Sequence, residues 1–111
     1  MLTDLSELGF KKAESIKSIF KFNHANYFDY SVINEESKEI LADFSLFSID
    51  IQFKNNMIVF TDSCKRTIIT LLLTNLSDVY YLPENPCNDL EVYFTFQSYT
   101  IKLLFNAVYS R

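Results

Sequence analysis

Residues 90–105, LEVYFTFQSYTIKLLF, decide the fold. A two-residue turn at Gln97 and Ser98 places each apolar residue of the first half opposite an apolar residue of the second half. The expected pairs are Phe96 with Tyr99, Phe94 with Ile101, Val92 with Leu103 and Leu90 with Phe105. Because the remaining polar residues collect on the opposite face, the sequence predicts an antiparallel hairpin with one buried face.

A second hairpin is expected around Asn55 and Asn56, since asparagine tolerates the left-handed backbone that such a turn requires. This turn gives the facing pairs Phe53 with Ile58, Ile51 with Phe60 and Asp50 with Thr61. A further tight turn over residues 62–65 would place Ile58 opposite Ile69. These pairs extend the predicted sheet by two strands.

The segment before this second hairpin changes its alternation midway. Residues 27–33 and 38–46 flank the polar stretch NEES and so predict another hairpin. In its second arm, apolar residues occupy even positions as far as Leu46 and odd positions from Phe47 to Phe53. Such a change of frame predicts a bulge or a sharp bend between Leu46 and Phe47.

Two segments fit either a strand or a helix. Residues 35–47 could form a helix with one apolar face, capped by Asn34. Residues 63–76 contain a short apolar run that does not fix its own period, so a buried helix is the alternative there. Both alternatives stay open at the level of sequence.

The N-terminal region has a different period. From Asp4 to Phe22 the apolar residues recur at intervals of three and four, which predicts an amphipathic helix over residues 1–22. The expected fold class is therefore α+β, with one domain over residues 1–111. In this fold the N-terminal helix packs on a curved, mainly antiparallel sheet of five to eight strands formed by residues 27–105.

Composition excludes several classes of site. The chain has 111 residues, of which 49% are hydrophobic, and it contains one glycine. Loops that cradle phosphates need several glycines so that the backbone can approach the ligand, which excludes the common nucleotide-binding loops. The longest apolar run, residues 68–73, is too short to span a bilayer, and the N-terminus does not resemble a signal peptide. With Cys64 and Cys87 expected to be reduced thiols, we expect a cytoplasmic protein that does not contact a membrane.

Residue types that carry catalysis or bind metals are scarce. His24 is the one histidine, and no acid lies beside it in the sequence. It is expected to be a solvated or capping residue just past the end of the helix. His24, Cys64 and Cys87 also lack the spacing of a metal site. We therefore expect no catalytic residue, no metal ligand, no cofactor and no enzymatic activity.

The formal net charge of −4 is concentrated in the middle of the chain. Residues 22–62 hold seven acids and two lysines, which argues against nucleic acid as a partner for this surface. A carboxylate-rich surface suits a basic protein, and tyrosines supply contact area at small entropic cost. The residues expected to contact such a partner are Asp29, Glu35, Glu36, Glu39, Asp43, Tyr80, Tyr81 and Glu84.

Two functions fit these features. In size, charge and lack of catalytic motifs the chain resembles the immunity proteins that bacteria pair with secreted toxins. This resemblance implies a small inhibitor that occludes a basic partner such as a nuclease toxin. The alternative is a non-catalytic structural or adaptor subunit of a larger assembly, or a protein that self-associates through its sheet. Salt dependence separates the two, because charge mimicry weakens steeply with salt and sheet docking does not.

Overall fold

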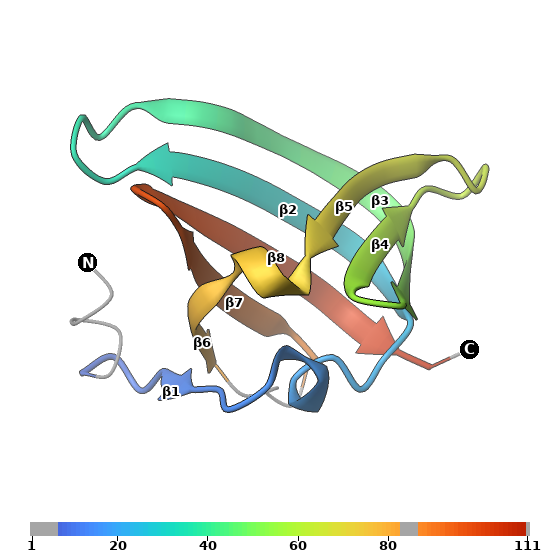
Figure 1. Cartoon of the computed structure of the whole chain (residues 1–111). Coiled ribbons are helices and arrows are strands. Elements are labelled where there is room, and N and C mark those ends of the chain that lie inside the picture. Colours follow the sequence, from blue (N-terminus) through green and yellow to red (C-terminus); the bar gives the residue numbers. More distant parts are fainter. Residues whose placement is uncertain (1–6, 83–86, 111) are drawn as a thin grey trace.

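The computed structural model describes residues 7–82 and 87–110, without the side chains of Ile16 and Asn75, and consists of one antiparallel sheet (Figure 1). The sheet has eight strands in the order β1-β6-β7-β8-β2-β3-β4-β5. The strands are β1 (Lys11–Lys12), β2 (His24–Asn34), β3 (Ile40–Lys54), β4 (Met57–Thr61), β5 (Thr67–Leu72), β6 (Ser77–Leu82), β7 (Leu90–Phe96) and β8 (Tyr99–Tyr109). Two 3-10 turns are also present, η1 (Ile16–Ser18) and η2 (Leu73–Asn75). Because β2 pairs with β8, the first long strand and the last lie side by side at the centre of the sheet.

The predicted N-terminal helix is wrong, and the α+β class is wrong with it. Residues 7–22 form a turn, β1 and η1 instead of an α-helix, while residues 1–6 lie outside the described part of the chain. Gly9 has a φ of 94°, a left-handed conformation that interrupts a right-handed helix. Leu8, which a helix would bury, is 69% exposed. Ala13, Ile19, Phe20 and Phe22 pack against the core from an irregular strap, residues 13–22, that includes η1.

Both hairpins with two-residue turns are confirmed in the predicted register. In β7 and β8 all four expected apolar pairs face one another, and in β3 and β4 the three expected pairs do so too. Each turn begins with a left-handed residue, Asn55 with a φ of 55° and Gln97 with a φ of 57°. The chain meets this demand with polar side chains instead of glycine.

The alternative helix over residues 63–76 is wrong, because the segment forms β5 and η2. The predicted register of β5 is also wrong, since Ile58 pairs with Leu71 and not with Ile69. The loop over residues 62–66 is one residue longer than the predicted turn, and a bulge in β5 opposite Phe60 and Thr61 adds a second residue. The Asp62 carboxylate holds this loop by accepting hydrogen bonds of 2.9 Å from two of its N–H groups. A shift of two residues keeps the same face of β5 toward the core.

β2 and β3 form the predicted hairpin, so the alternative helix over residues 35–47 is wrong. The predicted change of frame is present, but it lies at Ser48, whose φ is 60°. Phe44 and Leu46 pack inward at even positions, and the inward-facing residues from Ile49 onward are at odd positions. Phe47 therefore points outward and is 78% exposed, which contradicts the prediction that it begins the inward-facing set.

This distortion crosses three adjacent strands. The register places Asn26 of β2 opposite Ser48 of β3 and Ala107 of β8, and these two neighbours have φ angles of 60° and 54°. Across this bend line (Asn26, Ser48 and Ala107) the buried residues step by three positions instead of two. The three steps are Leu46 to Ile49, Phe28 to Ala25 and Phe105 to Val108. The strand register is the same on both sides, so the line turns the sheet without adding a residue.

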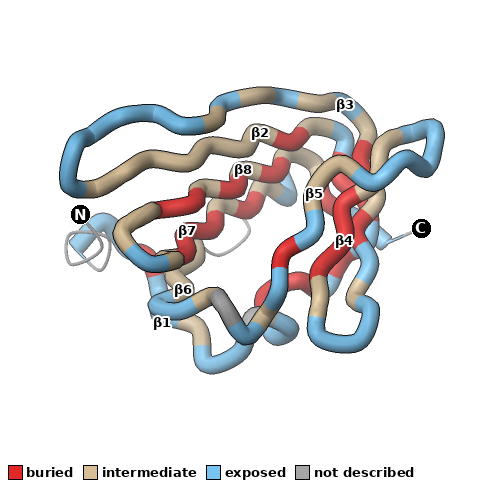
Figure 2. The backbone as a smooth tube through the Cα atoms, turned by 45° about the horizontal axis from the view of Figure 1, so that its top comes forward, coloured by how far each residue is buried: buried red, intermediate tan, exposed pale blue. Residues whose placement is uncertain are grey.

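The core lies inside the curled sheet. β4 and β5 fold back over the inner face of β2 and β8 (Figure 1), so the Phe60 ring stacks on the Phe28 ring with 5.3 Å between centroids. Phe20, from the strap, meets Phe105 edge-on at 5.6 Å. Figure 2 shows buried residues gathered along β7, β8 and β4, whereas the loop between β2 and β3 is exposed. Each fully buried aromatic side chain stabilises the fold by about 1.5–3 kcal/mol relative to exposure.

Candidate functional site

The outer face of β2 and β3 carries an aromatic pair, the half-buried Tyr27 and the exposed Phe47. The two rings meet edge-on with 5.3 Å between centroids, and the residues are partners in the β2–β3 ladder. The left-handed backbone at Ser48 turns Phe47 outward, so its ring lies in water. Large exposed aromatic side chains on an ordered strand are candidate anchors for a partner protein.

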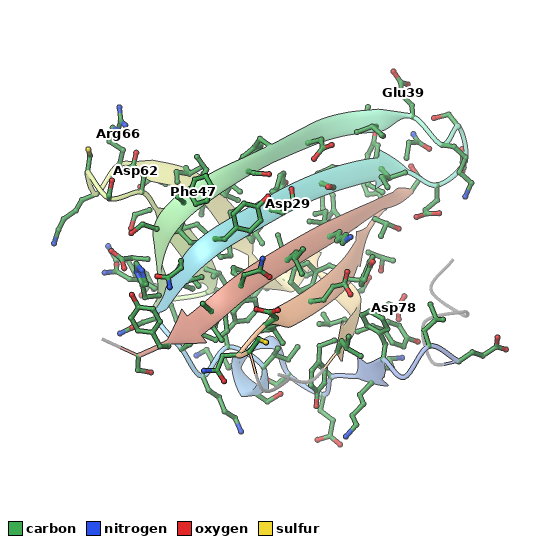
Figure 3. The ribbon with its side chains drawn as sticks, turned by 180° about the vertical axis from the view of Figure 1, so that it is seen from behind. Asp29, Glu39, Phe47, Asp62, Arg66 and Asp78 are labelled. Atoms are coloured by element: carbon green, nitrogen blue, oxygen red, sulfur yellow. The ribbon has the colours of Figure 1, made fainter. Side chains whose placement is uncertain are left out.

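Asp29 lies beside the aromatic pair on the same face (Figure 3). The Tyr27 hydroxyl donates to Ser45 Oγ at 2.9 Å, and Ser45 Oγ donates to Asp29 Oδ1 at 3.2 Å. This chain of hydrogen bonds holds the carboxylate and the phenol in one arrangement. Such pre-ordering lowers the entropic cost of binding.

Asp43 occupies the next row of the outer face. Ser31 Oγ donates to its Oδ1 at 3.4 Å. The ladders continue this row from Ser31 through Lys102 and Tyr93 to Tyr80. Tyr80 therefore shares a face with Asp43, but β2, β8 and β7 separate the two residues.

A cluster of side chains without net charge lies between the Asp43 end and the Tyr80 end of this row. Lys102 Nζ lies 3.3 Å from Glu91 Oε1, and the Tyr93 hydroxyl donates to the same oxygen at 3.4 Å. Burial raises the pKa of the Tyr93 phenol, and the negative charge of Glu91 raises it further. The phenol therefore stays protonated while Lys102 balances Glu91, so the unbalanced negative charge of this face lies on the β2–β3 side.

The three expected glutamates of the loop that joins β2 and β3 differ in their exposure to solvent. Glu36 and Glu39 are exposed, whereas Glu35 is half-buried and pairs with Lys38 at 3.1 Å. The nearby Thr100 hydroxyl is the main cause of a lowered pKa at Glu35; burial opposes this effect and Lys38 adds to it. Glu35 Oε1 and the buried Thr100 Oγ1 nevertheless have no hydrogen-bond partner of good geometry among the described residues. Glu35 thus belongs to the loop's own structure, and Glu36 and Glu39 are the acids presented to solvent.

The remaining expected contact residues do not join this face. Tyr81 packs against the core from the inner face of β6, opposite Val92. Glu84 lies outside the described residues. Sequence reasoning missed Tyr27 and Phe47, although the change of frame in the alternation of β3 was the signal that pointed to them.

His24 is buried, so the prediction of a solvated residue beyond a helix is wrong. Its Nδ1 lies 2.7 Å from Asp50 Oδ1, and its ring packs on Tyr109 with 4.7 Å between centroids. Within residues 7–82 and 87–110, no three His, Cys, Asp or Glu side chains form a group that could hold a metal ion. The contact between His24 and Asp50 joins the first residue of β2 to β3.

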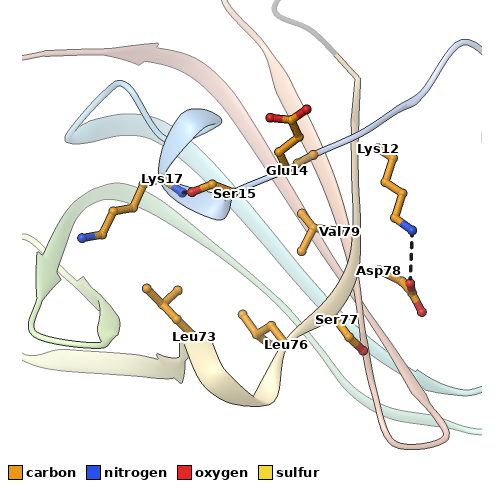
Figure 4. A pocket seen from close by; sticks show the side chains of 10 residues that line it. Lys12, Glu14, Ser15, Lys17, Leu73, Leu76, Ser77, Asp78 and Val79 are labelled. Atoms are coloured by element: carbon orange, nitrogen blue, oxygen red, sulfur yellow. Dashed lines mark hydrogen bonds and ion pairs between the residues drawn. The ribbon is translucent and has the colours of Figure 1, made fainter.

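A pocket of about 380 Å³ lies between the N-terminal strap and the η2–β6 segment (Figure 4). Its charged lining residues are two lysines and two acids, and one of each, Lys12 and Asp78, forms an ion pair at 3.7 Å. Mixed charge of this kind gives no field of one sign that would attract a charged substrate. The outer face of β2 and β3 is therefore the stronger candidate.

No helix in the described residues is long and apolar enough to cross a bilayer. Comparison of the chain with protein-family models, with curated proteins and with solved structures finds no significant match.

Proposed function

We propose that the protein is a non-catalytic, cytoplasmic inhibitor that binds a basic protein through the outer face of β2 and β3. The observation that carries this proposal is the exposure of Phe47, 78%, beside a tyrosine and a hydrogen-bonded carboxylate. Aromatic anchors within a polar rim are the usual anatomy of a protein interface. The aromatic pair would supply contact area, and Asp29 and Asp43 would set orientation.

The charge of this arm supports a basic partner. Residues 24–54 hold six acids and two lysines, and Lys38 is already paired with Glu35. An excess of one sign along a long two-stranded arm attracts an oppositely charged protein and raises its association rate. Carboxylates on such an arm could imitate the phosphates that a nuclease toxin binds, which is how a toxin-neutralising immunity protein would act.

The alternative is a structural or adaptor subunit. The same Phe47 ring could anchor a permanent assembly, in which apolar contact contributes most of the affinity and charge contributes little. The two functions differ in their response to salt, because the Debye length falls from about 30 Å at 0.01 M to about 3 Å at 1 M. Association governed by charge slows over this range, and apolar docking does not.

The test is affinity capture from the source cell with three immobilised proteins: the wild type, Phe47→Ser and the control Leu8→Ser. Leu8 is also an exposed apolar residue, but it belongs to the N-terminal segment. The proposal expects a partner with a basic contact surface that the wild type and Leu8→Ser retain, and that Phe47→Ser loses. The captured partner should also lose its own activity when it is bound. A partner retained equally by Phe47→Ser, or one with an acidic contact surface, would contradict the proposal.

A further inference from the structure

β5 is the last strand of the sheet, and none of the described strands pairs with its outer edge. On its inner edge the Leu73 N–H donates to the Asn56 carbonyl at 3.0 Å. Hydrogen-bonded and non-bonded pairs alternate along an antiparallel ladder, so Ile69 and Leu71 also direct their main-chain groups toward β4. The residues whose main-chain N–H and C=O groups point away from the sheet are Thr70 and Leu72.

An apolar hollow of about 500 Å³ adjoins this outer edge. Three successive residues of β5, 70–72, line it, so the strand turns its edge rather than one face toward the hollow. The far wall consists of Tyr30, Val32, Leu41, Phe96, Tyr99 and Ile101, from four other strands. None of the residues that line the hollow is charged.

Tyr30 supplies a polar group in this apolar wall. Its side chain is half-buried against Phe44, and burial raises the pKa of its phenol. Within the described chain no residue accepts a hydrogen bond from its hydroxyl at ordinary geometry. The hollow therefore combines mostly apolar walls with a few polar groups, the Tyr30 hydroxyl among them, which is the composition of ligand sites of this size.

We propose that the β5 edge binds a short, extended, uncharged peptide segment of a partner protein as an added strand. The main chain of the peptide pairs with Thr70 and Leu72, and its alternate apolar side chains enter the hollow. A charged side chain there would lose its water and meet no opposite charge, which sets the chemistry of the occupant. This site goes beyond the proposed function, because it lies on the inner side of the sheet and shares no residue with the outer face of β2 and β3.

The walls favour a single strand over a second copy of this chain. A second copy that offered its own β5 would bring β4 and β3 behind that strand. Residues of β2, β3, β7 and β8 line the hollow opposite β5, so the strands that a second copy brings behind its β5 would meet these walls. A lone segment satisfies the outer edge of β5 without this clash.

The experiment pans a displayed library of random octapeptides against the whole protein. The selected peptides should be uncharged at their centre, apolar at alternate positions and free of proline. In the wild-type protein, the amide hydrogens of Thr70 and Leu72 should exchange at least tenfold more slowly when a selected peptide is bound. A peptide N-methylated at alternate residues should bind at least tenfold more weakly, because it lacks the donors that a strand needs.

Two variants of Thr70 test whether the main chain of β5 binds the peptide. Thr70→Pro removes an N–H that points away from the sheet, a position where an edge strand tolerates proline, and it should weaken peptide binding at least tenfold. Thr70→Val keeps the main chain and should change binding less than threefold. Equal binding of the N-methylated peptide would show simple apolar partition and overturn the proposal. So would a panning experiment that selects no peptide, or a wild-type protein that dimerises through β5 and excludes peptide.

Discussion

Nδ1 of the buried His24 lies 2.7 Å from Oδ1 of Asp50, and this contact fastens the first residue of β2 to β3 on the far side of the bend line. The imidazole is buried while part of the Asp50 side chain reaches solvent. A polar ring in this position costs free energy unless hydrogen bonds compensate for its lost water.

Asp50→Ala should therefore reduce the free energy of unfolding by about 1–3 kcal/mol, the cost of removing a hydrogen-bond partner from a buried group. Urea denaturation followed by circular dichroism measures this change. The control is Gln52→Ala, an exposed residue two positions along β3, which should change stability by less than about 0.5 kcal/mol. Equal effects of the two substitutions would show that the His24–Asp50 contact does not stabilise the fold.

Gln97 occupies a backbone conformation that suits glycine, since its φ is 57°. Gln97→Gly should raise stability by about 0.5–1 kcal/mol, because the left-handed strain of a side-chain-bearing residue slightly exceeds the entropy that glycine adds to the unfolded chain. Thermal denaturation measures the shift. The adjacent Ser98 is the matched control: its φ is not positive, so Ser98→Gly should leave the protein no more stable.

Phe47 and Phe28 lie on adjacent strands but in opposite environments, one 78% exposed and the other fully buried. Phe28→Ala should cost about 3–5 kcal/mol through lost contacts and a cavity. Phe47→Ala should cost about 0.5 kcal/mol or less, as is usual at the surface. Denaturation midpoints of the two variants test this contrast. A large loss for Phe47→Ala would mean that the ring serves the fold, and any loss of binding could then reflect unfolding.

Asp62 should make the β4–β5 loop sensitive to acid. The Arg66 N–H is the main cause of a lowered pKa at this carboxyl; burial opposes the effect, and the Arg66 side chain and the Cys64 N–H add to it. A pKa below the ordinary value of 3.8 means that the ionised form favours the folded state. The stabilisation is therefore complete above the ordinary value and is lost as the pH falls through the lowered one.

Two measurements test this prediction. Carboxyl chemical shifts should give a pKa for Asp62 below 3.8. Asp62→Ala should lower the melting temperature near neutral pH, and its difference from wild type should shrink in strong acid. Ser63→Ala, at the exposed neighbouring residue, should show neither effect. A difference that stays constant with pH would assign the effect of Asp62→Ala to something other than its charge.

Charge on the β2–β3 arm should control association with the partner. The triple variant Glu36→Lys, Glu39→Lys and Asp43→Lys reverses exposed acids without touching the half-buried Glu35. Its association with the captured basic partner should be slower by about tenfold or more at low salt, because complementary charge mainly raises the association rate. Stopped-flow kinetics at several salt concentrations measure the effect.

A second triple variant controls for net charge. Glu7→Lys, Glu14→Lys and Asp78→Lys produce the same change in total charge at exposed positions away from the β2–β3 arm. This control should associate at close to the wild-type rate once salt screens distant charges. If both variants slow association equally, the partner responds to total charge and the arm is not the binding surface.

Local patterns in the sequence predicted the elements whose partners are close along the chain. The hairpins around Gln97 and Asn55 have the predicted registers because a single turn and one apolar face fix every pair. The N-terminal segment was predicted to be a helix because its apolar residues recur at intervals of three and four, but the strap is irregular, and Phe20 and Phe22 both pack on Phe105. The spacing of apolar residues alone does not distinguish a helix from an irregular segment that packs on the core.

The same local patterns did not predict which strands far apart in the sequence pair with one another. The pairing of β2 with β8 joins residues far apart in the chain, and no local signal announces it. The exposure of Phe47 depended on whether the frame changes before that residue or after it, and both positions fit the alternation. The hollow beside β5 exists only once β2, β7 and β8 have curled around it. Sequence reasoning therefore placed acids on the β2–β3 arm but missed its aromatic anchor.

The bend line makes the shape of the whole protein depend on three residues. Loss of one residue from a regular strand turns every later side chain inside out, but loss of Ser48 would bring Leu46, Ile49 and Ile51 into plain alternation. Removal of Asn26, Ser48 and Ala107 together would leave each strand correctly patterned and the sheet far flatter. The hollow would then open, and long apolar edges would be available to copies of the same chain, as in the stacked sheets of fibres. Three deletions that remove no residue of the buried core would thus convert a curled sheet into a template for aggregation.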